Sequence, residues 1–297
     1  MFKYTKKVNV VDIQWYPGHM TKTRRMMEEN QKLIDIVVEL LDARIPLSSR
    51  NPAIDEIFPN KPRLVVLNKS DIADSKITNE WEKYFANKGL NVRSISSVSG
   101  KSLNEVFTAC KEILKDKIEH DKARGLVNRP IKMMVVGIPN VGKSSFINKL
   151  SGKKSAITGD RPGVTRGKQW IRLANSFELL DTPGILWPKF EDISVGEKLA
   201  FTGAIKDEIM DLEEIACRLL LKLKELYPDS LTARYKMTDF DDLDGYELLQ
   251  LLGKKRGFVV SGGEIDTERA AKILLAEFRG AKLGNISLER PMDFTEE

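Results

Sequence analysis

The chain contains few of the residues that build disulfides and metal centres. Its 297 residues include two cysteines and two histidines. Cys110 and Cys217 stand alone, without the short spacings of a zinc or iron–sulfur site. Isolated cysteines of this kind are expected as small buried side chains in a reducing compartment. The sequence therefore argues against a disulfide-stapled fold.

Long hydrophobic stretches are also missing. No uninterrupted apolar run approaches about eighteen residues, so no transmembrane helix is expected. The first residues, MFKYTKK, lack the apolar centre of a signal peptide. With 41% hydrophobic and 31% charged residues, the composition is that of an ordinary soluble protein, long enough for two domains. The sequence therefore predicts a cytoplasmic protein with no membrane partner.

The basic residues are unevenly distributed. The net charge is +5, yet residues 143–172 carry eight basic side chains against one acidic side chain. Residues 1–32 carry seven basic side chains against three acidic ones. Such stretches suit a polyanion such as RNA, although a simple solvated face would look the same. RNA is the expected nucleic acid, and DNA is not expected as a partner.

The first part of the chain alternates between strand and helix patterns. Five short apolar runs end where polar residues cluster, and helix-like stretches lie between them. The expected strands are residues 33–41, 63–67, 91–96, 131–136 and 176–180. The expected helices are residues 79–88, 102–119 and 143–150. This alternation predicts an α/β domain with a mostly parallel sheet, whose strand ends line one ligand crevice.

The pattern changes after residue 188. Residues 211–227, 243–252 and 266–279 have helical spacing, and no strand pattern accompanies them. We therefore expect two domains, an α/β domain at 1–188 and a smaller all-α domain at 189–297. The acidic end, residues 293–297, is expected to fray.

A phosphate-binding loop is the strongest local motif. Residues 137–145 read GIPNVGKSS and match GxxxxGK[ST], between an expected strand and an expected helix. Backbone N–H groups of this loop can hold phosphates at the helix N-terminus. Lys143 is expected to reach the β- and γ-phosphates, and Ser144 is expected to bind magnesium. The remaining nucleotide contacts are expected from Asn140, Val141, Gly142 and Ser145.

A tetrad that can recognise guanine precedes this loop by about seventy residues. Residues 68–71 read NKSD. A carboxylate at Asp71 can accept from the ring N–H and the exocyclic amine of guanine, whereas adenine offers no such donor pair. Lys69 is expected along the base, and Asn68 is expected to link this segment to the phosphate loop. Ser96 and Ser97, at the end of the next strand, are expected to complete the base site.

Two elements after the phosphate loop complete the set found in P-loop GTPases. Residues 181–184 read DTPG, so Asp181 is expected to hold magnesium and Gly184 to sense the γ-phosphate. Thr165 lies in an expected switch loop and is the candidate magnesium-sensing threonine. The guanine tetrad comes before the phosphate loop, whereas ordinary GTPases have the reverse order. With these five elements in rotated order, the chain resembles the circularly permuted GTPases.

Four further segments narrow the resemblance. Residues 15–20 read WYPGHM, 42–46 read DARIP, 181–188 read DTPGILWP and 245–249 read GYELL. With these, the chain resembles the circularly permuted ribosome biogenesis GTPase A (YlqF) family over nearly its whole length. The resemblance implies a cytoplasmic GTPase that acts in late assembly of the large (50S) ribosomal subunit. It also implies that the helical domain binds rRNA, and a monomer is expected.

One residue departs from ordinary GTPases. The residue after DTPG is usually a glutamine that positions the attacking water, and here it is Ile185. His19 could act in its place, or it could be a plain loop histidine. A potassium ion could also help, because Asn140 matches a potassium-ligand position in related GTPases, although asparagine also suits the loop geometry.

Two other classes of function remain open at this point. Ile185 would also suit a GTP-binding scaffold that does not hydrolyse. A GTP-dependent RNA-modifying enzyme is the other alternative, but residues 189–297 contain no histidine and only Cys217 as a thiol. The favoured interpretation is a GTPase whose γ-phosphate controls association with the ribosome and whose hydrolysis releases it.

Overall fold

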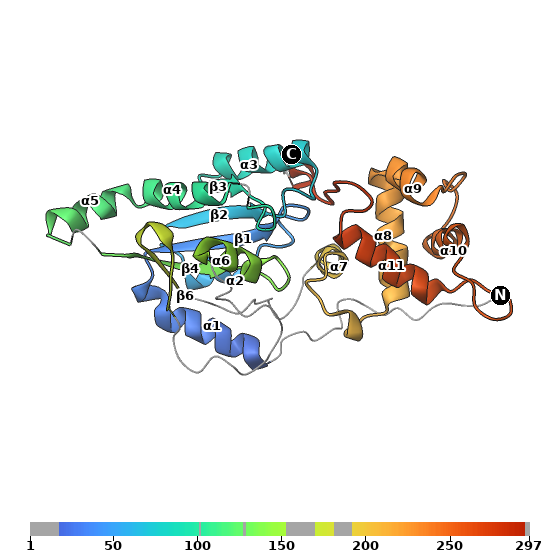
Figure 1. Cartoon of the computed structure of the whole chain (residues 1–297), viewed down its shortest axis with the longest axis horizontal. Coiled ribbons are helices and arrows are strands. Elements are labelled where there is room, and N and C mark those ends of the chain that lie inside the picture. The colour runs from blue at the N-terminus through green and yellow to red at the C-terminus, as the bar shows by residue number, and fades with distance from the viewer. Residues whose placement is uncertain (1–17, 101, 127–128, 153–169, 181–191, 295–297) are drawn as a thin grey trace. The chain divides into compact units, whose positions relative to one another are not determined.

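The computed structural model describes residues 18–100, 102–126, 129–152, 170–180 and 192–294. These residues form two compact units, and most of their helices and strands are labelled in Figure 1. One unit contains the described part of residues 18–180 together with 289–294, and the other contains residues 192–288. Within these ranges, no helix is both long and apolar enough to cross a membrane.

A six-stranded sheet forms the centre of the first unit, which we call the α/β unit. Its order is β3-β2-β1-β4-β6-β5, and all neighbours are parallel except β5 and β6. The strands are β1 (Ile36–Asp42), β2 (Arg63–Asn68), β3 (Asn91–Ser94), β4 (Ile131–Val136), β5 (Trp170–Arg172) and β6 (Phe177–Leu180). From β1 the chain adds β2 and then β3 outward on one side, and on the other side it runs from β4 to the edge strand β5 and returns to β6 between them. The carboxyl ends of β1 and β4 therefore flank the point where a ligand crevice is expected.

The mostly parallel α/β fold is confirmed, with one strand that the sequence did not reveal. Strand β5 has only three residues and pairs antiparallel with β6 at the sheet edge, so it carries almost no periodic signal. The other five strands lie where the apolar runs predicted them. Strand β1 is buried along all seven residues, as expected for a central strand covered on both faces.

The helices of the α/β unit follow the expected pattern with one break. They are α1 (Gly18–Asn30), α2 (Ala53–Ile57), α3 (Ser75–Asn87), α4 (Leu103–Ile113), α5 (Lys115–Ala123) and α6 (Lys143–Ser151), and short 3-10 turns are η2 (Gln31–Leu33) and η3 (Ala174–Ser176). The predicted helix 102–119 divides at Leu114, because the apolar face ends there and α5 buries no residue. Helix α3 begins earlier than predicted, since Asp74 caps it by accepting the N–H groups of Lys76 and Ile77.

The second unit, the helical unit, contains no β-strand among its described residues 192–288, only an isolated bridge between Val259 and Ile265. Its elements are α7 (Ile193–Phe201), η4 (Asp207–Ile209), α8 (Leu212–Leu226), α9 (Pro228–Tyr235), α10 (Gly245–Arg256) and α11 (Thr267–Arg279). Four of the helices begin at an aspartate whose side chain accepts backbone N–H groups of the first turn. These caps are Asp192, Asp211, Asp244 and Asp266.

The end of the chain departs from the expected domain plan. Residues 289–294, expected in the helical domain, belong to the α/β unit. They include the 3-10 turn η5 (Pro291–Phe294), whose ring at Phe294 lies 5.9 Å from the ring of Trp81. Asp293 and Phe294 are exposed but lie in an ordered turn where fraying was expected, since the Asp293 carboxylate accepts from the N–H of Arg290 at 2.9 Å and the Phe294 ring contacts Trp81. Residues 295–297 lie outside the described ranges.

The two cysteines are confined by their surroundings. Cys110 is buried and Cys217 is half-buried. Burial raises the pKa of both thiols to about 12. Both side chains are therefore neutral thiols at physiological pH, as expected for packing residues.

Candidate functional site: a guanine-nucleotide crevice

The phosphate loop runs from the end of β4 into α6 and depends on two glycines. At Gly137 a Cβ would lie 2.6 Å from the carbonyl oxygen of Leu40 in β1. At Gly142, which has a φ of +99°, a Cβ would lie 2.4 Å from the side-chain nitrogen of Asn68. Both positions therefore need glycine, because a side chain would push the loop away from its neighbours.

Lys143 is the buried cation of this loop. Its side chain is 9% exposed, and its Nζ donates to the carbonyl oxygens of Gly137 (3.0 Å) and Ile138 (2.8 Å). These bonds hold the ammonium group against the phosphate loop, which leads into the N-terminus of α6. A fixed positive charge beside a helix N-terminus is suited to bind phosphate.

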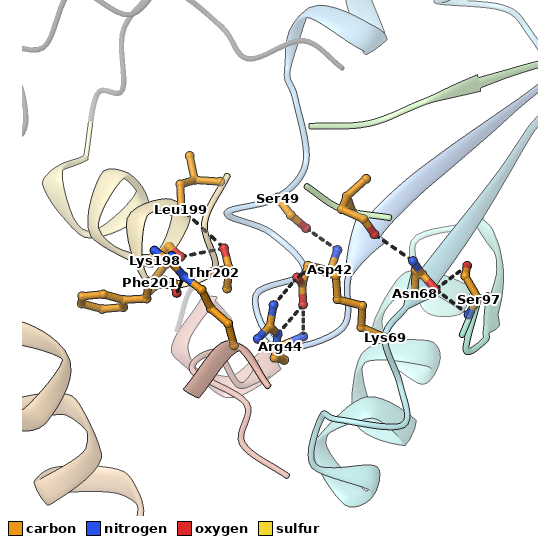
Figure 2. A network of polar contacts seen from close by, with 12 residues as sticks. Asp42, Arg44, Ser49, Asn68, Lys69, Ser97, Lys198, Leu199, Phe201 and Thr202 are labelled. Atoms are coloured by element: carbon orange, nitrogen blue, oxygen red, sulfur yellow. Dashed lines mark hydrogen bonds and ion pairs between the residues drawn. The ribbon is translucent and has the colours of Figure 1, made fainter. Parts of the chain in front are cut away.

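Asn68 joins the three segments that the sequence assigned to the base and phosphates. Its Nδ2 donates to the carbonyl oxygen of Val141 in the phosphate loop at 2.8 Å. Its Oδ1 accepts from the N–H and the hydroxyl of Ser97 at 3.1 and 2.8 Å, as Figure 2 shows. The predicted link between the guanine tetrad and the phosphate loop is therefore present. It is fully buried, since Asn68 is 1% exposed.

The other two serines near the base site also hold backbone. Ser96 is buried, and its hydroxyl accepts from the N–H of Ser99 at 3.1 Å. Ser70 donates from its N–H and from its hydroxyl to the carbonyl oxygen of Ile95, at 3.1 and 2.9 Å. These bonds tie the tetrad to the end of β3 and leave Asp71 exposed, where a base could reach it.

Asp42 is the functional candidate that sequence reasoning missed. Its carboxylate accepts from Nε and Nη2 of Arg44 at 2.9 and 2.8 Å, and from Nζ of Lys69 at 2.9 Å (Figure 2). Burial alone favours the neutral acid, but the two cations outweigh it and hold the pKa of Asp42 well below its usual range. A buried carboxylate thus fixes the ammonium of Lys69, the residue expected along the base.

Strand register explains this cluster. Asp42 ends β1 directly beside Asn68, the last residue of β2. Lys69 then turns back with a φ of +64°, which brings its side chain toward Asp42. In the sequence, the segment DARIP at 42–46 served only to indicate the family resemblance. Its position at the end of an expected strand was the signal that could have predicted the ion pair of Asp42 with Lys69.

Several expected site residues lie outside the described ranges. These are Thr165, Asp181, Gly184 and Ile185. The backbone of His19 lies in the first turn of α1, where the sequence suggested a turn before any helix, and its side chain lies outside the description.

Magnesium fits the part of the site that is described. Ser144 is half-buried in the first turn of α6, next to Lys143, so a hydroxyl oxygen stands where the phosphate loop meets the helix. Within the described residues, no group of three or more His, Cys, Asp or Glu side chains could hold a metal by itself. Magnesium characteristically uses one or two protein oxygens together with substrate phosphates, so this sparse donor set suits it.

Comparisons with known proteins agree with this geometry. Residues 132–242 match the family described as "50S ribosome-binding GTPase". The chain is 51% identical over 285 residues to the Ribosome biogenesis GTPase A of Bacillus cereus, covering 96% of each chain. It is 33% identical over 283 residues to the protein of that name from Thermotoga maritima, covering 95% of this chain and 96% of the other.

Two solved structures of a YlqF protein are also similar to this chain. The GNP-bound crystal structure of YlqF from T. maritima matches with a TM-score of 0.64 at 28% identity, covering 91% of this chain and 98% of the other. Its GDP-bound structure matches with a TM-score of 0.65. These matches favour a hydrolase over the non-hydrolysing scaffold and the RNA-modifying enzyme. The chain belongs to the ribosome biogenesis GTPase A family, and it is a GTP hydrolase with a role in ribosome biogenesis.

Proposed function

We propose that this GTPase is an assembly factor of the large (50S) ribosomal subunit that binds rRNA through its helical unit. GTP binding and hydrolysis would control its association and release. The description of the matched family names the 50S ribosome, and the names of the relatives support a role in ribosome biogenesis. The structural observation that carries the GTP-dependent part of the proposal is the joining of the guanine tetrad to the phosphate loop by Asn68. We propose that the protein is cytoplasmic, because ribosomal subunits assemble in that compartment. We also propose that it is a monomer.

The base is proposed to lie between the tetrad and the segment at Ser96 and Ser97. Asp71→Asn should weaken GTP binding by at least about tenfold, because the paired acceptor for guanine is lost. The variant should gain affinity for xanthosine triphosphate, whose ring presents an acceptor at that edge. Titrations with fluorescent GTP and XTP analogues measure both effects. Unchanged GTP affinity would remove Asp71 from the base site.

The phosphates are proposed to bind the loop at Asn140–Ser145, with Lys143 on the β- and γ-phosphates. Magnesium is proposed to bind Ser144, Thr165 and Asp181, and Gly184 is proposed to sense the γ-phosphate. When bound, magnesium would neutralise charge on the transferred phosphate. Chelation by EDTA should abolish hydrolysis, and Ser144→Ala should raise the magnesium concentration needed for half-maximal rate. An unchanged requirement would remove Ser144 from the metal site.

The side chain of Ile185 can neither donate nor accept a hydrogen bond. We therefore propose that the attacking water is positioned by His19 or by a potassium ion held by Asn140. The same hydrolysis assay separates the two. His19→Ala should slow hydrolysis by about 10²-fold with GTP affinity kept, if His19 positions water. Sodium in place of potassium should slow it if Asn140 holds the cation, and equal rates in both salts would exclude that role.

The rRNA surface of the helical unit is proposed to include Lys254, Lys255 and Lys282. Other basic residues nearby are already engaged inside the unit. Arg256 bonds Glu277, Lys272 bonds Glu268, Arg279 bonds Asp207, and Arg269 lies over the Phe258 ring. The three lysines are exposed, and among the described residues no acidic side chain pairs with them. Their charges are the ones most available to a polyanion.

Replacing Lys254 and Lys255 together by alanine should weaken binding to purified 50S subunits and rRNA. Each lost phosphate contact should lower the slope of log affinity against log salt by about one, so the double variant should lose about two. The matched control is Lys222→Ala with Lys272→Ala, which removes two lysines paired on the same unit. Equal slopes in both variants would place the rRNA surface elsewhere.

A further inference from the structure

Glu289 is a buried carboxylate that takes no part in the GTP site. It is 1% exposed, although it is the ninth residue from the end of the sequence. Its oxygens accept from the N–H of Leu47 at 2.8 Å, from the N–H of Ser48 at 3.2 and 3.3 Å, and from the hydroxyl of Ser48. A buried carboxylate with three donors is a strong attachment, because opening it would break three charge-assisted hydrogen bonds inside the unit.

The backbone of Glu289 and the turn η5 that follows it also contact the α/β unit. The indole N–H of Trp81 in α3 donates to the carbonyl oxygen of Glu289 at 3.1 Å. The turn η5 then places the ring of Phe294 against Trp81, which is itself fully buried, and η5 lies beside α3 in Figure 1. Glu289 and the ring of Phe294 therefore attach the segment 289–294 to the α/β unit.

A second anchor lies just before it, in the helical unit. The hydroxyl of Tyr227, between α8 and α9, accepts from the N–H of Ser287 and donates to its carbonyl oxygen, both at 3.1 Å. Ser287 is fully buried. The chain is therefore fixed to the helical unit at Ser287 and to the α/β unit at Glu289.

Only Leu288 separates the two anchors. Two residues of extended chain span at most about 7 Å, so this connection has no slack. The anchor on the α/β unit is the loop after β1, four residues beyond Arg44, which bonds the carboxylate of Asp42. The connection is thus attached close in sequence to the cluster that holds Lys69.

We propose that residues 287–289 form a fixed pivot. The Glu289 anchor stays closed in every nucleotide state, and any nucleotide-dependent movement of the helical unit is a rotation about Leu288. The proposal rests on the proposed function only for its effect on ribosome binding, since the anchor itself can be tested without ribosomes.

Hydrogen exchange resolved to Leu47 and Ser48 tests the anchor in the full-length protein. Their amides should be protected to within about twofold in a non-hydrolysable GTP analogue, in GDP and without nucleotide. Glu289→Ala should speed their exchange by about tenfold or more, while β1 stays protected. Glu289→Gln, which keeps one acceptor oxygen, should lie between, and exposed Glu268→Ala should change nothing. Exchange that rises in one nucleotide state, or is unaffected by Glu289→Ala, would overturn the proposal.

Lengthening the connection between the two anchors tests whether the pivot is needed for nucleotide-dependent binding to 50S subunits. A Gly-Ser-Gly-Ser insertion between Leu288 and Glu289 keeps both anchors and should bring the ratio of 50S affinities in the GTP-analogue and GDP states close to one. The same insertion between Gly262 and Gly263, in an exposed turn of the helical unit, should leave the ratio as in the parent. An unchanged ratio with the first insertion would overturn the pivot. If the parent shows no ratio above one, the proposed function fails, and the exchange experiment still decides the anchor.

Discussion

Lys143→Ala should slow single-turnover GTP hydrolysis by about 10³-fold, the largest effect expected of any substitution in the chain. The ammonium group is held against the phosphate loop by the carbonyl oxygens of Gly137 and Ile138. Phosphoryl transfer depends on fixed positive charge that stabilises the developing negative charge, so its loss is felt mainly in the transition state. Rapid-quench measurement at saturating enzyme reports the chemical step.

The matched control for that substitution is Lys149→Ala. Lys149 is an exposed residue in the last turn of the same helix, α6, so the two variants remove the same charge from one element. The control should hydrolyse GTP at the parental rate, and both variants should retain a cooperative thermal transition. Similar rates for Lys143→Ala and Lys149→Ala would show that Lys143 does not serve the phosphates.

Asp42→Asn should destabilise the protein by about 3–5 kcal/mol, the second of the two largest effects. Asp42 and Arg44 are each almost fully buried, and removing one charge of a buried ion pair is strongly destabilising. Lys69 would lose its fixed partner as well, so GTP affinity should fall together with stability. Urea unfolding monitored by tryptophan fluorescence measures the free energy of unfolding.

The same carboxylate predicts a dependence on pH. The pKa of Asp42 is lowered on folding, so its ion pairs contribute full stability above the unfolded value of about 3.9. That contribution is lost as pH falls below this value toward the lower folded pKa. The wild type should therefore lose more stability on acidification than Asp42→Asn does. Asp116→Asn, an exposed aspartate in α5, should keep the wild-type slope, and identical slopes for all three proteins would contradict the assignment.

The sequence predicted the parts of the site that depend on local order. The apolar runs located β1, β2, β4 and β6, because each is a short, largely buried strand that ends at polar residues, and residues 91–96 located the partly exposed strand β3. The phosphate loop could be predicted because close backbone approach at Gly137 and Gly142 allows only glycine, which leaves a recognisable motif in the sequence. Both signals are contained in a few neighbouring residues.

The contacts that the sequence did not predict join distant segments. The ion pair of Asp42 with Lys69 exists because β1 and β2 pair in one particular register. Glu289 binds Ser48 across 241 positions of sequence, and no periodic pattern records such a pairing. The break at Leu114 and the short edge strand β5 were missed because tertiary packing, rather than propensity, decides them.

The central claim is that the 50S subunit and this GTPase act on each other through GTP. Single-turnover hydrolysis with and without purified 50S subunits tests it most directly, because Ile185 leaves the chain without the usual water-positioning glutamine. We expect 50S subunits to speed hydrolysis by at least about tenfold in potassium buffer, with 30S subunits as the control. Hydrolysis at the same rate with 50S subunits, with 30S subunits and with neither would contradict the account.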